Sequence, residues 1–106
     1  MATTQKITNG DKTGTAPATW LVYMLECAGG RIYTGIATDV AARFAKHCAG
    51  RGAAFTRINK PLRIMAAMPC GNRSEATKTE SNLKKLRRPA KLMWAVQWPW
   101  SQAQGG

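Results

Sequence analysis

Five side chains of this sequence have the types needed for metal-assisted cleavage of a phosphodiester. They are two phenols, one guanidinium, one imidazole and one carboxylate, which occur in the chain order Tyr23, Tyr33, Arg43, His47 and Glu80. A guanidinium can hold phosphate oxygens, a histidine can accept a proton near neutral pH, and a carboxylate can hold a divalent cation. Each residue type is common alone, so the signal is the ordered set.

Three strands and three helices are expected to position these side chains. The segments 20–27 and 31–36 are strand-like and are joined by a glycine-containing loop typical of a hairpin, and 62–68 predicts a third strand. An odd-length loop, closed for instance by a Glu26/Gly30 pair, places the two tyrosines opposite each other on one face. A two-residue loop places them on opposite faces, and the sequence alone does not decide the register.

The first helix is expected at 40–48, with Thr38 or Asp39 as its N-cap. Val40, Arg43, Phe44 and His47 then form one stripe, which predicts that Arg43 and His47 lie beside core-facing residues rather than on the solvent side. A surface arginine and a packed or capping histidine are the alternatives.

Ser74 is expected to cap a second helix that runs to about Arg87, and a third helix, 90–96, follows a proline. In the second helix Glu80 shares a protein-facing stripe with Ala76 and Leu83. A buried charge is usually paired, hydrogen-bonded or bound to a metal. The alternative to a metal is an ion pair with Lys84 or with a strand arginine.

The ordered set resembles the GIY-YIG nuclease family. The first motif is degenerate, Val22-Tyr23-Met24, and the second reads Tyr33-Thr34-Gly35, as in the small stand-alone bacterial members; the resemblance covers about residues 19–95. It implies an α/β fold in which a small three-stranded mixed sheet is flanked by helices, in the order β-β-α-β-α-α. It also implies an endonuclease that hydrolyses DNA phosphodiesters with Mg²⁺ or Mn²⁺.

The resemblance further implies a role for each of the five side chains. Glu80 holds the metal, Arg43 contacts the scissile phosphate, and Tyr33 with His47 delivers the nucleophilic water, while Tyr23 supports them by hydrogen bonding. A phenol is a poor base unless cations such as Arg43 and the metal lower its pKa. Whether Tyr33 or His47 is the general base stays open, as does the residue that replaces an asparagine found in many members.

The charge balance points to nucleic acid as the partner. Sixteen Lys and Arg against five Asp and Glu give a net charge of +11, a field that attracts polyanions. We expect single-stranded or branched DNA to be preferred, with little sequence specificity, no membrane and no obligate protein partner. The alternative function is a module that binds single-stranded DNA or RNA without cutting. The predicted DNA-contacting residues are Arg51, Arg57, Lys60, Lys84, Lys85 and Arg88, with Gly35 as a close backbone approach to the phosphate.

The chain is expected to form one domain over residues 19–100, after a disordered polar tail at 1–18 and before a frayed C-terminus at 101–106. Three cysteines without a Cys-x-x-Cys spacing indicate neither a disulfide framework nor a zinc site. No apolar run approaches the ~20 residues that span a bilayer, so a cytoplasmic location is expected. The tryptophans near the C-terminus are expected to close the core, with stacking on unpaired bases as the alternative.

Overall fold

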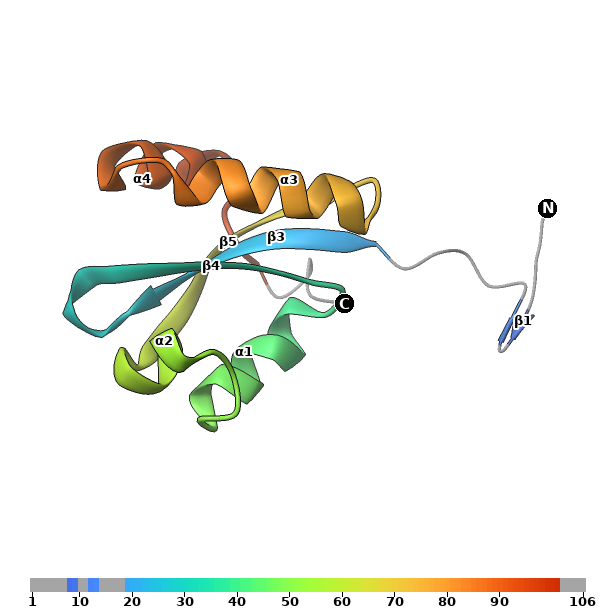
Figure 1. The fold of residues 1–106 in the computed structure, drawn as a ribbon, viewed down its shortest axis with the longest axis horizontal. Coiled ribbons are helices and arrows are strands. Elements are labelled where there is room, and N and C mark those ends of the chain that lie inside the picture. Colours follow the sequence, from blue (N-terminus) through green and yellow to red (C-terminus); the bar gives the residue numbers. More distant parts are fainter. Residues whose placement is uncertain (1–7, 10–11, 14–18, 102–106) are drawn as a thin grey trace.

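The computed structural model of this protein describes residues 8–9, 12–13 and 19–101 (Figure 1). Its elements, in chain order, are β1 (Thr8–Asn9), β2 (Lys12–Thr13), β3 (Trp20–Cys27), a 3-10 turn (Ala28–Gly30), β4 (Arg31–Ala37), α1 (Val40–Cys48), α2 (Ala54–Ile58), β5 (Pro61–Cys70), α3 (Arg73–Lys84) and α4 (Arg88–Gln97). The strands β1 and β2 pair antiparallel with each other. The other residues of the predicted tails, in 1–18 and 102–106, lie outside the described part of the chain.

The central sheet has three strands in the order β4-β3-β5, which confirms the α/β class and the number of strands. Both neighbours of β3 run antiparallel to it, so the prediction of a mixed sheet is wrong in this respect. The physical reason is the position of β5. It runs in the same direction as β4, but it lies on the other side of β3, and no parallel pair forms.

Helices cover both faces of this sheet, with α3 and α4 on one face and α1 and α2 on the other (Figure 1). Strand residues alternate between two cores, as the period of two requires. Val22 and Met24 pack with Ala76 and Leu83 of α3 in the first core. The second core contains Tyr23, Leu25 and Cys27 of β3, with Val40 of α1.

The hairpin loop is odd-length, but it is shifted by one residue from the example given above. Cys27 pairs with Arg31 across the three-residue turn, so Tyr23 lies opposite Gly35, and Leu25 lies opposite Tyr33. The two tyrosines therefore share a face as diagonal neighbours rather than as a direct pair. Their ring centroids are 6.3 Å apart.

Side-chain caps begin the helices α1 and α3. Asp39 caps α1 by accepting a hydrogen bond from the amide of Ala42 at 3.0 Å, as expected. Asn72, not Ser74, caps α3, because its side-chain oxygen accepts from the amide of Glu75 at 2.9 Å. The helix α3 also ends at Lys84, short of the predicted Arg87.

The C-terminal segment extends the sheet at β5. Ala66 and Pro99 form an antiparallel bridge, and the Ala67 amide donates to the Trp98 carbonyl at 3.0 Å. Trp98 packs against the first core and Trp100 against the second. The prediction that these tryptophans close the core is confirmed. Among the described residues, no helix combines the length and apolar character needed to cross a membrane.

Candidate active site

A buried hydrogen-bond chain joins β3, α1 and α2 on the face that carries the tyrosines. The Tyr23 hydroxyl lies 3.0 Å from His47 Nε2, and His47 Nδ1 lies 2.8 Å from Thr56 Oγ1. Thr56 in turn donates to the Ala53 carbonyl at 2.9 Å. Tyr23, His47 and Thr56 are all buried, so these bonds replace the water that the groups would otherwise contact.

The chain fixes the tautomer of the imidazole. The one hydroxyl proton of Thr56 goes to the Ala53 carbonyl, so its oxygen accepts from Nδ1–H of His47. Burial, and next the charge of Arg43, lower the pKa of His47, which favours the neutral ring. In the neutral ring Nε2 is then the acceptor, and Tyr23 donates to it. His47 therefore accepts a hydrogen bond from Tyr23.

Two charged side chains from different helices act on the Tyr23 hydroxyl. Burial raises the pKa of this phenol above its ordinary value, Tyr33 and the Glu80 carboxylate raise it further, and Arg43 lowers it. Arg43 acts on Tyr23 in the direction expected of a cation, but desolvation outweighs it, so the pKa of this phenol is raised. Tyr23 therefore keeps its proton and acts as a hydrogen-bond donor.

Arg43 is exposed, which corrects the prediction that it lies beside the core-facing side of its helix. Val40 and His47 of the same stripe are buried, and Phe44 is half-buried. Position 43 is at the margin of this stripe, where a guanidinium can remain hydrated. It is thus near enough to influence Tyr23 and His47, and open enough to meet a phosphate.

Tyr33 forms the more open wall of the site. Its ring is half-buried and lies 5.0 Å from the His47 ring and 5.8 Å from the Phe55 ring, measured between centroids. The sequence-based hypothesis paired Tyr33 with His47. In the structure these two are in ring contact, whereas the hydrogen bond to His47 comes from Tyr23.

Two glycines give the aromatic groups their room. A Cβ on Gly35 would lie 2.7 Å from the Tyr23 hydroxyl oxygen and 3.1 Å from Tyr33 Cε2. A Cβ on Gly52 would overlap the imidazole of His47. Gly35 is thus required by the tyrosine rings themselves, a reason independent of the predicted approach to a phosphate. Gly52 is needed for the position of His47.

Glu80 lies on the protein-facing side of α3, as its stripe predicts. Ala76 and Leu83 are buried, and the Glu80 side chain is 20 % exposed. Its Oε2 lies 3.1 Å from Lys84 Nζ, so the alternative of an ion pair with Lys84 is realised. The described residues contain no group of three or more His, Cys, Asp or Glu side chains that could hold a metal. A single partly exposed carboxylate fits Mg²⁺, which keeps most of its waters, but not a metal that needs several protein ligands.

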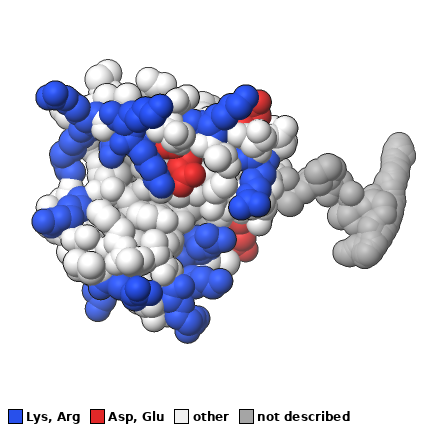
Figure 2. Space-filling view, in the orientation of Figure 1, with Lys and Arg blue, Asp and Glu red and all other residues white. Residues whose placement is uncertain are grey.

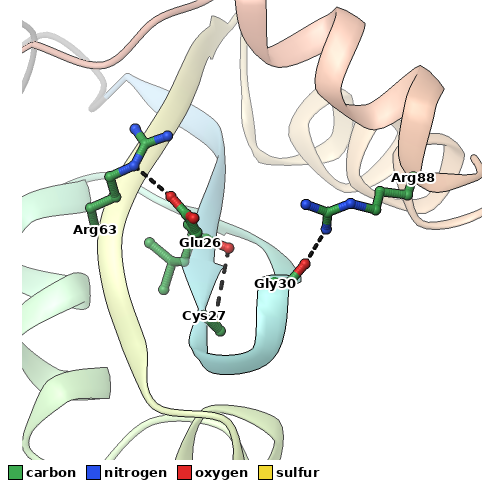
Figure 3. A network of polar contacts seen from close by, with 6 residues as sticks. Glu26, Cys27, Gly30, Arg63 and Arg88 are labelled. Carbon is green, nitrogen blue, oxygen red and sulfur yellow. Dashed lines mark hydrogen bonds and ion pairs between the residues drawn. The ribbon is translucent and has the colours of Figure 1, made fainter.

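The predicted DNA-contacting cations, Arg51, Arg57, Lys60, Lys84, Lys85 and Arg88, are all exposed. Figure 2 shows basic side chains gathered over the α3–α4 side and over the α1–α2 side of the viewed face, with acidic atoms between them. Arg88 also donates to the Gly30 carbonyl, which ties α4 to the hairpin tip (Figure 3). Arg63 forms an ion pair with Glu26 at 2.6 Å (Figure 3).

Comparison with known proteins assigns this chain to a family. The model of the GIY-YIG catalytic domain matches residues 19–93. The chain belongs to the GIY-YIG nuclease family. Members of this family act on DNA.

Relatives of this GIY-YIG domain carry the name UPF0213 protein. One from Cupriavidus necator is 45 % identical over 84 residues, which are 79 % of this chain and 91 % of that protein. Another from Cupriavidus pinatubonensis is 48 % identical over 77 residues, 73 % of this chain and 86 % of that protein. The solution NMR structure of the UPF0213 protein BH0048 from Bacillus halodurans is 38 % identical, covers 74 % of this chain and 84 % of its own, and gives a TM-score of 0.48. The name UPF0213 states no activity.

Sequence reasoning gave no role in the site to Gly52, Phe55 or Thr56. The available signal was weak, because Phe55 and Thr56 lie in the five-residue helix α2, which is too short to show a helical pattern. A hydroxyl beside the only histidine becomes visible only when α1 and α2 pack together.

Proposed function

We propose that this GIY-YIG domain is a DNA endonuclease that uses Mg²⁺ or Mn²⁺ and prefers single-stranded or branched DNA. One observation carries the proposal: the hydroxyl of Tyr23 on β3 has a buried histidine partner and lies within electrostatic reach of one cation and one carboxylate. His47 is hydrogen-bonded to it, and the charges of Arg43 and Glu80 shift its pKa in opposite directions. Such opposed charges around a proton-transfer pair are characteristic of catalytic sites.

Arg43 is the phosphate-binding group in this proposal. Its guanidinium is exposed, so it can donate two hydrogen bonds to phosphate oxygens without losing a buried partner. Negative charge grows on these oxygens as the water attacks phosphorus. The interaction therefore strengthens in the transition state and lowers the barrier.

The proton of the attacking water passes through Tyr23. Tyr33, on the open wall, orients the water, whose oxygen bonds to phosphorus as the bond to the leaving oxygen breaks. The water's proton goes to the Tyr23 oxygen while Tyr23 gives its own to His47 Nε2. The imidazolium keeps its Nδ1–H bond to Thr56, and the leaving oxygen takes a proton from solvent.

Glu80 would hold the metal together with water molecules and phosphate oxygens, and the bound metal would supply Lewis-acid stabilisation of the phosphate. The ion pair with Lys84 directs this carboxylate along the helix. Lys84 is more exposed than Glu80, so it can turn toward the DNA backbone when a cation takes its place.

The deciding experiment is cleavage of a labelled single-stranded oligonucleotide with Mg²⁺, Mn²⁺ or EDTA. Wild type should cut with either metal and not in EDTA. Glu80→Gln should lose on the order of 100-fold or more in rate while binding DNA normally, because several kcal/mol of metal assistance is removed. Glu75→Gln, on an exposed position of the same helix, is the matched control. Binding without cleavage in either metal would establish the competing function, a non-cutting module.

A further inference from the structure

A shallow pocket lies at the tip of the β3–β4 hairpin, between α2 and α4. These two helices approach the hairpin tip from opposite sides of the sheet (Figure 1). The pocket has a volume of about 340 Å³ and is lined by Gly30, Arg31, Ile32, Phe55, Arg88 and Lys91. It is separate from the Tyr23–His47 pair, but Phe55 connects the two places.

The polar lining of this pocket is cationic. Arg31, Arg88 and Lys91 contribute three positive charges, and none of the acidic side chains in the described part of the chain lines it. Arg88 uses one guanidinium nitrogen on the Gly30 carbonyl, which leaves further N–H groups for a ligand. Arg31 and Lys91 form no ion pair with a described residue. These charges suit an anionic ligand.

The apolar lining is dominated by an aromatic ring. Phe55 is 37 % exposed, and its ring lies 5.8 Å from that of Tyr33, with 35° between the planes. Tyr33 in turn contacts the ring of His47. The row His47, Tyr33, Phe55 therefore leads from the candidate active site into the cationic pocket, and its outer end is free to stack.

We infer that this pocket binds one unpaired nucleotide of the DNA strand, next to the phosphate that is cut. The base stacks on Phe55, and its phosphate is held by Arg31 and Lys91. A base can reach Phe55 only if it is not stacked in a duplex. The inference rests on the proposed function for the position of the cut phosphate, and it gives that function a structural reason for preferring unpaired DNA.

The test measures binding in EDTA, where no cutting is expected, by fluorescence anisotropy. The probes are a labelled single strand of about 12 nucleotides and an abasic strand of the same length, within the range of single-strand site sizes. Phe55→Ala should weaken binding of the base-bearing strand by about 5- to 100-fold, the range for loss of one stacked base, and should change binding of the abasic strand by less than about twofold. Phe55→Trp should retain the preference for bases.

Ile58→Ala is the matched control, since Ile58 belongs to the same short helix, is 82 % exposed and does not line the pocket. It should bind both strands like wild type. Lys91→Ala should weaken binding of both strands equally and make the affinity depend less on salt concentration. Its control is Lys78→Ala, at an exposed position of α3. Thermal unfolding confirms that each variant is folded.

An equal loss on base-bearing and abasic strands in Phe55→Ala, or no loss on either, would overturn the inference. Binding is measured in EDTA and does not depend on cleavage. A failure to cleave DNA with Mg²⁺ or Mn²⁺ would therefore contradict the proposed endonuclease without affecting the binding test. Conversely, if wild type cleaves DNA and Phe55→Ala keeps the preference for base-bearing strands, the pocket does not bind a base, and the proposal of an endonuclease is unaffected.

Discussion

The Tyr23 hydroxyl and His47 Nε2 are hydrogen-bonded at 3.0 Å, and neither residue is open to solvent, with 1 % and 3 % exposure. The only histidine of the chain thus has its accepting nitrogen occupied by a phenol. A water molecule cannot give a proton to His47 directly. Any proton that reaches the imidazole from a substrate must pass through Tyr23, so the two residues act as one unit.

This coupling predicts that Tyr23→Phe and His47→Ala have similar effects on the rate and are not additive in the double variant. Each should lower the single-turnover rate by about 100-fold, within the range for general acid–base catalysis, with little change in DNA affinity. Rapid-quench cleavage of a labelled oligonucleotide measures this. Multiplying effects in the double variant would mean that the two residues act independently.

Arg43→Ala should lower the rate of chemistry by about 100- to 1000-fold and the affinity for DNA by much less, because the guanidinium is proposed to act on charge that develops in the transition state. Arg43→Lys should recover only part of the rate, since a lysine lacks the planar pair of donors. Arg51→Ala is the control, an exposed arginine in the loop after the same helix. If Arg43→Ala loses affinity and rate in the same proportion, Arg43 is an ordinary phosphate contact.

Stability should depend on pH through His47. Its folded pKa is lowered, so the unfolded chain binds more protons, and the free energy of unfolding rises with pH. The contribution should be fully present above the unfolded value of about 6.5 and should be lost as the pH falls from there through the folded pKa. Urea unfolding between pH 5 and 8 measures it. His47→Gln should flatten the curve in this window, and an unchanged slope would show that another group is responsible.

Gly52→Ala should displace the imidazole of His47, because a Cβ at that position overlaps Nδ1. We expect a loss of about 1–3 kcal/mol in the free energy of unfolding, as for overpacked sites, and a reduced cleavage rate. Gly71→Ala is the matched control, since a Cβ there meets no atom within 4 Å. Equal stability of the two variants would show that α2 can move away from His47 at no cost.

Single-stranded and branched DNA should be cut faster than blunt duplex of the same sequence, without sharp bands at one sequence. Affinity for the single strand should fall linearly with the logarithm of salt concentration, with a slope of about 0.7 per phosphate contacted. Cleavage ladders on matched substrates and a salt titration measure both. Equal cutting of blunt duplex and single strand would contradict the preference.

The sequence predicts most of the fold because its local signals agree with the packing. Asp39 begins α1 where expected, and the alternation of β3 gives the two cores. The exact register of the hairpin could not be predicted from the sequence. A three-residue loop shifted by one residue along the chain still places both tyrosines on one face, so the two registers fit the pattern equally well. The sheet is antiparallel because β5 pairs with β3 rather than with β4, and no local sequence pattern predicts which strand it pairs with.

The site could be predicted only in its residue types. The helical stripes correctly predicted that His47 and Glu80 face the protein. Arg43 was predicted to lie beside the core but is exposed, because a residue at the edge of a helical stripe can face either core or solvent. The raised pKa of Tyr23 could not be predicted, because burial of a side chain is a property of the packed structure. Thr56 and Phe55 come from a segment whose position depends on long-range contacts.

The bridge between Ala66 and Pro99 has a practical consequence for producing this protein. A chain shortened after Gln97 would leave the Ala67 amide and the Met65 carbonyl, on the outer edge of β5, without their partners, and it would also lack two tryptophans that shield the cores. An uncovered strand edge is a template for pairing with other chains. Such a truncation should precipitate rather than fold, so a C-terminal tag or fusion partner belongs beyond Trp100.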